Sequence, residues 1–260
     1  MDDDDLADML RHERRERLLE PTVSQGATLT HERARQHLME GYNRRVLMLR
    51  CSIDYVYAVA EESEGKPLSA FAVPELAIHV NSIWLNICGA LDNLAWALAY
   101  ELGFLPGLAE GHKEGRDSIG LAKPAFLSWL NSLEPVLGDQ LHSYQPWLTE
   151  LRDLRDPAAH RIPLYPIPGL LQGTAAEQAK ELFDKAGELM RTGRLSEGLQ
   201  LVDQGYSLAV YRPWMALSHD GQIEMRDIHR QMRTDDDQFA AISALVLNRI
   251  FRDAPSYRPI

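Results

Sequence analysis

Residues 74–102 read PELAIHVNSIWLNICGALDNLAWALAYEL and form the most apolar long stretch of this 260-residue chain. Their large apolar residues recur at steps of three and four, which is the spacing of one face of an α-helix. This stripe consists of Leu76, Val80, Ile83, Ile87, Leu91, Leu94 and Leu98. Further apolar residues widen the stripe, so we expect a helix that is enclosed on most sides. The Asn and Asp residues within it make the stretch too polar for a membrane span.

A second long helix is predicted just before this one. It begins near Thr30, a residue type that caps helix N-termini, and ends before Gly65-Lys66-Pro67. Two long helices with a short, proline-containing link between them favour antiparallel packing as half of a helical bundle. The fold class that we expect is therefore mainly α.

Shorter helices are predicted to complete this bundle. Prolines near the first turn mark helices over residues 124–133 and 135–142, and a further helix begins near residue 146. Three prolines between residues 163 and 168 then predict an extended strap. We expect three regions: a charged leader over 1–27, the bundle over 28–169, and a C-terminal region over 170–260.

The C-terminal region has a different pattern. Amphipathic helices are predicted over 175–192 and 195–202, and a last helix over 237–251. Between them, apolar stretches over 207–217 and 222–226 flank Asp220-Gly221, a favoured two-residue hairpin turn. Pro213 within the first of these strands suggests that the strand lies at an edge. This predicts a small β-hairpin between flanking helices.

The bulk composition narrows the class of protein. The formal net charge of −11 means that any contact with nucleic acid needs a local basic patch. Cys51 and Cys88 lie in apolar helical patterns and form no CxxC pair, which indicates two buried free thiols in a reducing compartment. The charged N-terminus has no apolar core of a signal peptide. We therefore expect a cytoplasmic protein that does not bind membranes.

Common signatures of nucleotide, hydrolase and metal sites are missing from the sequence. It contains no GxGxxG, GxxxxGK[ST], GxSxG or HExxH motif, and its nine histidines show no zinc-ligand spacing. We expect neither a metal nor a cofactor.

The strongest candidate site is the segment LRDPAAHR at residues 154–161. Asp156 and Pro157 suit the N-cap and the first position of a helix. Such a helix start would hold Arg155 and His160 beside backbone N–H groups that point at an anion. The flanking residues Arg152 and Arg161 add a local positive field, and a guanidinium with an imidazole suits a phosphoryl group.

At these residues the chain resembles the HEPN family, small helical bundles of bacterial toxin–antitoxin, phage-defence and CRISPR-associated proteins. Their hallmark is Arg-x4-His with a polar residue after the Arg, which Asp156 matches, and the resemblance covers about residues 30–165. Pro157 departs from the pattern, and Ile162 stands where some members carry a modified Tyr.

The resemblance implies metal-independent RNA cleavage. His160 would serve as general acid or base, Arg155 would stabilise the phosphate, and a homodimer would bring two motifs into one cleft. Asp92 and Asn93, polar residues in the apolar helix, would orient the motif. The alternative for these two residues is a hydrogen-bonded buried network.

Three functions remain open at this point. The first is a HEPN-type ribonuclease that acts as a toxin or defence effector and is controlled by an antitoxin or regulatory protein. The second is a non-catalytic HEPN-like module that binds a nucleotide or a protein partner, which the acidic net charge favours. The third is an interaction protein whose C-terminal hairpin and helix mediate oligomerisation.

Overall fold

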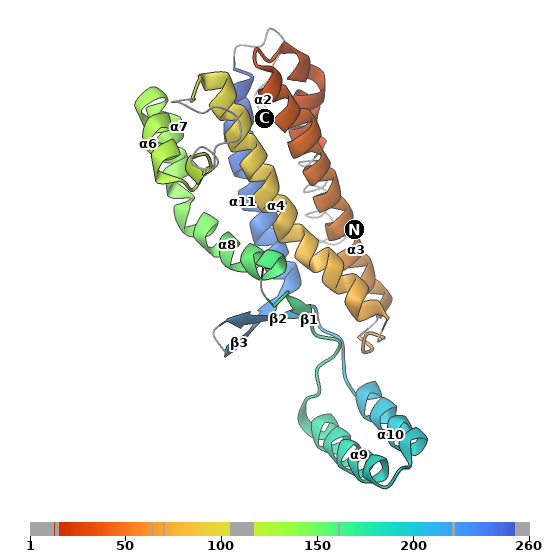
Figure 1. Ribbon diagram of the computed structural model, residues 1–260. Helices are drawn as coiled ribbons and strands as arrows, with labels where there is room; N and C mark the ends of the chain where they lie inside the picture. Colours follow the sequence, from red (N-terminus) through yellow and green to blue (C-terminus); the bar gives the residue numbers. More distant parts are fainter. Residues whose placement is uncertain are drawn as a thin grey trace. The chain divides into compact units, whose positions relative to one another are not determined.

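The structure is a computed structural model that describes residues 13, 16–63, 65–69, 71–104, 117–160, 162–219 and 222–252. The chain is mainly helical and carries a small antiparallel sheet, which confirms the expected fold class at that level (Figure 1). It divides into two compact units. We call Met1–Ser52, Asn81–Ile162 and Arg230–Ile260 the bundle unit, and Ile53–Val80 and Pro163–His229 the sheet unit. Residues 230–252 thus group with the bundle, whereas the expected boundary placed them in a C-terminal region.

The described end of the predicted leader is a packed helix. Residues 16–25 are helical, and Pro21 lies inside this helix. Leu18 is fully buried, and the hydroxyl of Thr22 donates a hydrogen bond to the amide oxygen of Asn43 at 2.6 Å. Residues 1–12, 14 and 15 lie outside the described residues.

The first long helical stretch is continuous but changes its winding. It consists of α2 (Glu32–Gln36), the π-helical turn η2 (His37–Tyr42) and α3 (Asn43–Ser63). Such π turns are rare and often occur at functional sites. The second long helix is α4 (Ala72–Leu102), close to its predicted bounds.

In the bundle unit, the first long helical stretch runs antiparallel to α4. Nδ1 of His37, in η2, lies 3.0 Å from Oδ1 of Asn93, and Nη1 of Arg45, in α3, lies 3.5 Å from the carbonyl oxygen of Leu85. Contact positions therefore rise along the first stretch as they fall along α4. In the sheet unit, Tyr55 of α3 stacks on His79 of α4 with ring centroids 4.1 Å apart.

The short helices α6 (Pro124–Leu133) and α7 (Pro135–Ser143) each begin at a proline, as predicted. They are followed by α8 (Gln145–His160). In Figure 1, α4 runs between α3 and α8. The largest buried side chains of the bundle unit include residues from η2, α3, α4, α6 and α11 (Ile228–Ile250): Leu38, Tyr42, Leu49, Ile83, Trp84, Leu94, Phe126 and Phe239.

The predicted helix start at Asp156 is wrong. Pro157 lies inside α8, which continues to His160. Buried leucines at positions 148, 151 and 154 anchor the inner face of this helix, and Pro157 itself is buried. Pro157 has no backbone N–H, so α8 loses one intrahelical hydrogen bond near its last turn. The burial of these side chains offsets that loss. Arg155 and His160 therefore lie near the C-terminus of α8 and not at the start of a new helix.

A buried carboxylate connects three helices of the bundle unit. Asp235 of α11 accepts hydrogen bonds from the indole nitrogens of Trp84 in α4, at 2.7 Å, and Trp147 in α8, at 2.8 Å. Gln231 donates a third bond, at 3.1 Å. Because Asp235 is only 1% exposed, these bonds replace its lost hydration and set α4 and α8 against α11.

The sheet unit contains three antiparallel strands in the order β1-β2-β3. They are β1 (Tyr165–Pro166) in the predicted strap, β2 (Trp214–His219) and β3 (Gln222–Asp227). His219 pairs with Gln222, as the predicted hairpin requires, while Asp220 and Gly221 lie outside the described residues. The expectation of an edge position at Pro213 is wrong, since this residue directly precedes the central strand.

The remaining helices of the C-terminal region begin near their predicted positions, with one exception. The sheet unit also holds the packed pair α9 (Gly173–Arg191) and α10 (Leu195–Ser207). The last helix, α11, begins at Ile228, well before its predicted start at Asp237. Within the described residues, no helix is both long and apolar enough to span a bilayer.

Close packing at the π turn gives a first testable prediction. A Cβ on Gly41 would lie 2.0 Å from Oδ1 of Asn93, the atom that contacts His37. We expect Gly41→Ala to lower the free energy of unfolding by about 1–3 kcal/mol, as overpacking does. Gly187→Ala, at a helical position with open space, is the matched control and should raise it by up to about 1 kcal/mol. Urea denaturation measures both, and an unchanged midpoint for Gly41→Ala would contradict the close approach.

Candidate functional site

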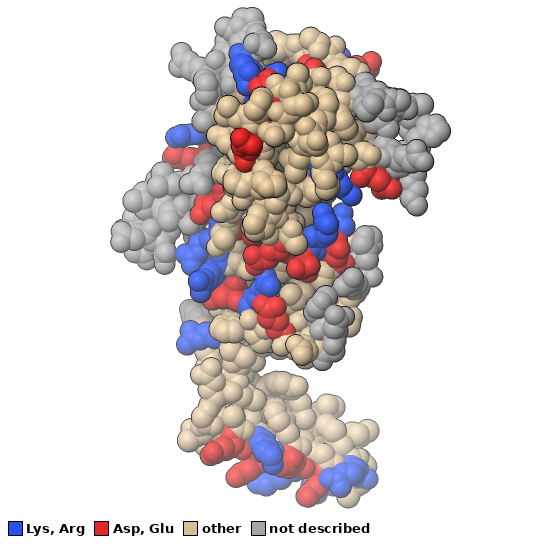
Figure 2. All heavy atoms as spheres, turned by 90° about the vertical axis from the view of Figure 1, so that its left-hand side faces the viewer, with Lys and Arg blue, Asp and Glu red and all other residues tan. Residues whose placement is uncertain are grey.

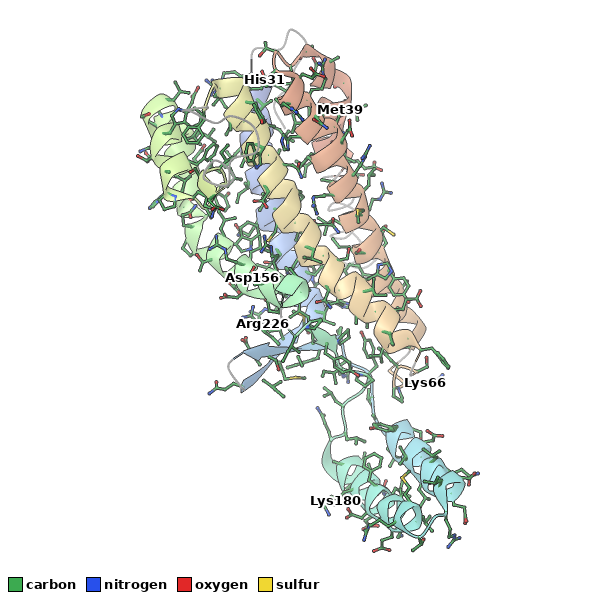
Figure 3. The ribbon with its side chains drawn as sticks, in the orientation of Figure 1. His31, Met39, Lys66, Asp156, Lys180 and Arg226 are labelled. Atoms are coloured by element: carbon green, nitrogen blue, oxygen red, sulfur yellow. The ribbon has the colours of Figure 1, made fainter. Side chains whose placement is uncertain are left out.

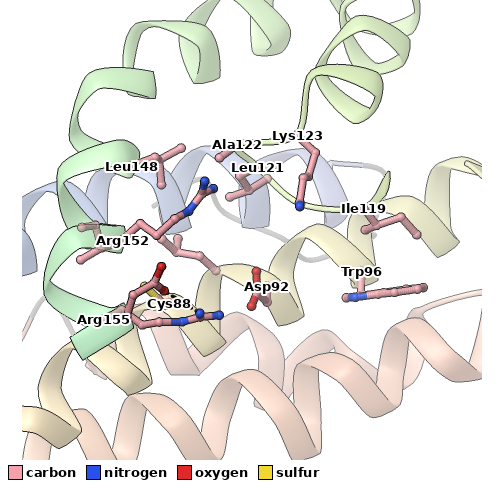
Figure 4. Close-up of a pocket in the computed structure, with 14 residues that line it drawn as sticks. Cys88, Asp92, Trp96, Ile119, Leu121, Ala122, Lys123, Leu148, Arg152 and Arg155 are labelled. Atoms are coloured by element: carbon pink, nitrogen blue, oxygen red, sulfur yellow. Dashed lines mark hydrogen bonds and ion pairs between the residues drawn. The ribbon is translucent and has the colours of Figure 1, made fainter. Parts of the chain in front are cut away.

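The bundle unit contains a cavity of about 430 Å³ between α4, α8 and residues 119–123, the segment that precedes α6 (Figure 4). Small-molecule sites in proteins have volumes of this order. Helix periodicity explains which side chains reach it. Cys88, Asp92 and Trp96 follow one another at four-residue intervals on α4, and Arg152 and Arg155 lie three apart on α8.

Five charged side chains line the cavity. Lys123, Arg152 and Arg155 bring three positive charges, whereas Asp92 and Asp156 bring two negative ones. Nη1 of Arg155 lies 2.8 Å from Oδ1 of Asp156, and both side chains are about one third exposed, at 34% and 32%. Within the described part of the chain, neither Lys123 nor Arg152 forms an ion pair. The cavity therefore carries local positive charge.

The charges on the face shown in Figure 2 are mixed: Lys and Arg side chains lie among Asp and Glu side chains. The cavity thus gathers positive charge in a protein with a formal net charge of −11. Asp156, labelled in Figure 3, projects from the C-terminal half of α8.

Asp92 lies on the cavity floor with its carboxylate directed inward (Figure 4). The surrounding protein removes water from the Asp92 carboxylate and so raises its pKa. The positive charges of Arg155, Arg45, Lys123 and Arg152 lower this pKa and so oppose the effect. Among the described residues none forms a hydrogen bond or an ion pair with this carboxylate. Its residue surface is nevertheless exposed, because it opens into the cavity. The carboxylate is therefore an available hydrogen-bond acceptor.

Cys88 lies beside Asp92 in the cavity wall, and its environment suppresses its reactivity. Burial, and then the negative charge of Asp92, raise the pKa of the Cys88 thiol to about 12. Since the thiolate is the nucleophile, this thiol is a poor one at neutral pH.

This thiol gives a second testable prediction. The expectation that both thiols are buried is wrong for Cys51, which is exposed, while Cys88 is half-buried. With iodoacetamide at pH 7.5, we expect Cys51 to be alkylated and Cys88 to remain largely unmodified in the folded protein. Peptide mass spectrometry measures the two rates, and denatured protein, in which both thiols should react, is the control. Equal rates in the folded protein would show that the surroundings of Cys88 do not suppress its reactivity.

The structure brings together only part of the predicted site. Arg152, Arg155, Asp156 and Asp92 all line the cavity. His160 is the last residue of α8, and its side chain lies outside what the structure describes, as does Arg161.

Asn93 belongs to a different contact. Its Nδ2 donates to the carbonyl oxygen of Gly89 at 2.6 Å, and its Oδ1 lies 3.0 Å from Nδ1 of His37. Burial lowers the pKa of His37, and the Asn93 contact opposes this effect. Asn93 thus connects α4 to the π turn η2, in agreement with the network alternative given for it.

The sequence did not predict Trp96 and Lys123 as cavity residues. Trp96 follows Asp92 by four residues, so helix periodicity places both on one face once Asp92 is considered. Lys123 directly precedes Pro124, the first residue of α6, and only the tertiary fold brings it beside α8. Its position in the sequence gives no signal of this.

In comparisons with known proteins, no protein-family model, no curated protein and no solved structure matches the chain. Within the described ranges, no group of three or more His, Cys, Asp or Glu residues could hold a metal ion.

Proposed function

We propose that the bundle unit is a HEPN-like module whose cavity binds a phosphoryl group through Arg152, Arg155 and Lys123. One observation carries this proposal: three cationic side chains, from α8 and from the segment that precedes α6, line a single cavity. Guanidinium groups bind phosphate oxygens through paired N–H donors, and a lysine adds a point charge. The cavity also provides the local positive field that an acidic protein needs to attract an anion.

Asp156 sets the strength of this interaction. Its carboxylate occupies Nη1 of Arg155 at 2.8 Å, so a phosphoryl group must compete for that donor or use the others. Arg152 and Lys123 then make the larger contribution. Because the charges are partly exposed, binding should weaken as salt increases.

A titration of the full-length protein with inorganic pyrophosphate at low salt tests the proposal. We expect Arg152→Ala to weaken binding about tenfold or more, the value of one charge-assisted hydrogen bond. Arg44→Ala is the matched control, because Arg44 is 68% exposed and pairs only with Glu40 among described residues. Equal affinity for the two variants, or no binding by the unmodified protein, would contradict the proposal.

Metal-independent RNA cleavage is the second candidate function. It is favoured by the position of Arg155, which lines the cavity one turn from the end of the helix that carries His160. In that mechanism His160 would transfer the proton of the ribose 2′-OH, and Arg155 would stabilise the charge on phosphorus-bound oxygens. A homodimer would supply a second histidine, and an antitoxin or regulatory protein would restrain the activity. We place binding first because the helix start expected at Asp156 is missing.

An RNA cleavage assay in EDTA separates these two functions. A ribonuclease of this type should lose cleavage in both Arg155→Ala and His160→Ala, while far-ultraviolet circular dichroism stays unchanged. Cleavage that persists in both variants would contradict the catalytic candidate. Pyrophosphate binding without cleavage by the unmodified protein would identify a binding module.

A further inference from the structure

One edge of the three-stranded sheet is an open strand. β3 pairs with β2 along one side, and no described strand pairs with its other side (Figure 1). Residues 222–225 of this strand are exposed. It contains no proline, and its register with β2 is continuous, so it lacks two features that often protect a sheet edge. Such an edge can accept a further strand through its backbone groups.

One backbone hydrogen bond fixes which groups of β3 face the open edge. The amide of Ile228, directly after β3, continues the β2–β3 register and donates to the carbonyl oxygen of Pro213 at 2.6 Å. In an antiparallel ladder, residue pairs that exchange such bonds alternate with pairs that do not. The even-numbered residues of β3 therefore bond to β2, whereas Ile223 and Met225 direct their backbone groups toward the open edge.

A second copy of β3 can meet this edge in a defined register. Residues directly opposite each other in a sheet lie on the same face. Two copies related by a two-fold axis must therefore pair even-numbered positions with even-numbered ones, and odd with odd. If the axis passes through Met225, the outward N–H and C=O groups of this residue bond to those of Met225 in the second copy.

The same register brings opposite charges together. Glu224 lies opposite Arg226 of the second copy, and Arg226 opposite its Glu224. Nε of Arg226 already donates to Oε1 of Glu224 within the strand, at 2.7 Å, and the Glu224 side chain is 56% exposed. Registers centred on Glu224 or on Arg226 place like charges opposite each other instead, which is unfavourable. Of these registers, the one centred on Met225 alone satisfies both the backbone and the charges.

Exposed apolar side chains lie on the other face of the same strands. Met225 and Tyr165 are both paired with Ala216 of β2, so they share a face. Ile223, two residues along β3, lies on this face as well. All three large side chains are exposed, Ile223 most of all, at 71%. In the paired sheet, Met225 contacts Met225 and Ile223 of the second copy, which removes apolar surface from water.

We propose that two copies of this chain dimerise through β3 and form a six-stranded antiparallel sheet about a two-fold axis at Met225. The partner is a second copy because this strand is complementary to itself in both backbone register and charge. The interface belongs to the sheet unit and shares no residue with the phosphoryl site, so the two proposals are tested separately.

Sedimentation velocity of the full-length protein over a range of concentrations tests the dimer. The unmodified protein should show a reversible equilibrium between monomer and dimer. Glu224→Arg and Arg226→Glu should each weaken dimerisation about tenfold or more, because each creates two like-charged pairs across the interface. Lys180→Glu is the matched control, since Lys180 is an exposed residue of α9, and it should change the affinity less than about twofold.

A mixture of the two charge variants tests the register. The Glu224→Arg copy carries positive charge at both positions, and the Arg226→Glu copy carries negative charge at both. The mixture should therefore regain dimers of about the original affinity, although neither variant dimerises well alone. Like charges still repel within each copy, so only pairing between copies explains this recovery, which also shows that both variants fold.

Met225→Pro tests the backbone contact. The N–H of Met225 faces the open edge, so a proline there spares the hydrogen bonds to β2 and should weaken dimerisation about tenfold or more. An unmodified protein that stays monomeric at about 1 mM would overturn the proposal. So would a dimer that all three substitutions leave unchanged, or a mixture of the charge variants that fails to regain dimers.

Discussion

Asp235→Ala is expected to lower the free energy of unfolding by about 3 kcal/mol or more. The substitution removes the acceptor of the indole N–H groups of Trp84 and Trp147 and one acceptor of the Gln231 amide. Trp84 is buried, whereas Trp147 and Gln231 are half-buried, and a buried donor that loses its acceptor costs about 1–3 kcal/mol. Removal of the carboxylate also relieves its own burial cost, but that gain is smaller than the loss at three donors. Urea denaturation followed by tryptophan fluorescence and circular dichroism measures the change.

Two controls make this result specific. Asp235→Asn keeps one acceptor oxygen and should lose about half as much stability, whereas Asp203→Ala, at an exposed position of α10, should change it by less than about 0.5 kcal/mol. A loss below about 1 kcal/mol for Asp235→Ala would show that the three bonds do not hold α4, α8 and α11 together.

The pH dependence of the same residue has a defined sign. Burial raises the pKa of Asp235, and the bonds from Trp84, Trp147 and Gln231 only partly oppose this effect. A carboxyl with a raised pKa in the folded state contributes stability that is fully present below the unfolded-state pKa. That contribution is lost as pH rises through the folded-state pKa. The stability difference between the unmodified protein and Asp235→Asn should therefore increase as pH falls from 7 toward 4, and a decrease would contradict this assignment.

The combined substitution Arg152→Glu and Arg155→Glu is expected to abolish binding of pyrophosphate. Loss of each guanidinium should weaken binding about tenfold or more, and each new carboxylate adds repulsion. The combined effect should exceed about 1,000-fold, which places binding beyond detection by calorimetry.

Two further variants control for this charge reversal. Arg44→Glu changes an exposed charge by the same amount and should alter affinity less than about threefold. Asp156→Asn removes the carboxylate that competes for Arg155, and it should strengthen binding severalfold. Weaker binding in Asp156→Asn would show that this carboxylate contributes to the site.

The sequence predicts the helices well because the signals that define them are local. Apolar spacing defines α4, and the prolines at positions 124 and 135 mark the first residues of α6 and α7. The hairpin follows from two apolar stretches around Asp220-Gly221, since His219 and Gln222 pair as that turn requires.

The same local signals fail at Asp156-Pro157. Asp followed by Pro is typical of a helix start, but three buried leucines on the preceding turns carry α8 through the proline. Tertiary burial therefore outweighs a local capping preference there. The predicted start of α11 at Asp237 is also too late. The helix begins at Ile228, directly after the last residue of β3, without a connecting loop.

The candidate site was predicted only in the part that lies on α8 and α4. Arg152, Arg155, Asp156 and Asp92 line one cavity because two predicted helices pack face to face. Asn93 follows Asp92 by one residue, and a helix turns by about 100° per residue, so its amide reaches η2 and not the cavity. Lys123 required the tertiary fold, because nothing in its sequence neighbourhood marks it as a ligand.

A crystal structure of the full-length protein with tungstate tests the central claim most directly. Tungstate is a tetrahedral dianion like phosphate, and its anomalous scattering locates it without ambiguity. We expect an anomalous peak inside the cavity, within hydrogen-bond distance of Arg152 and Arg155, that disappears in the Arg152→Glu, Arg155→Glu variant. An empty cavity at a tungstate concentration that saturates the protein in solution, with the anion bound elsewhere, would contradict the phosphoryl site.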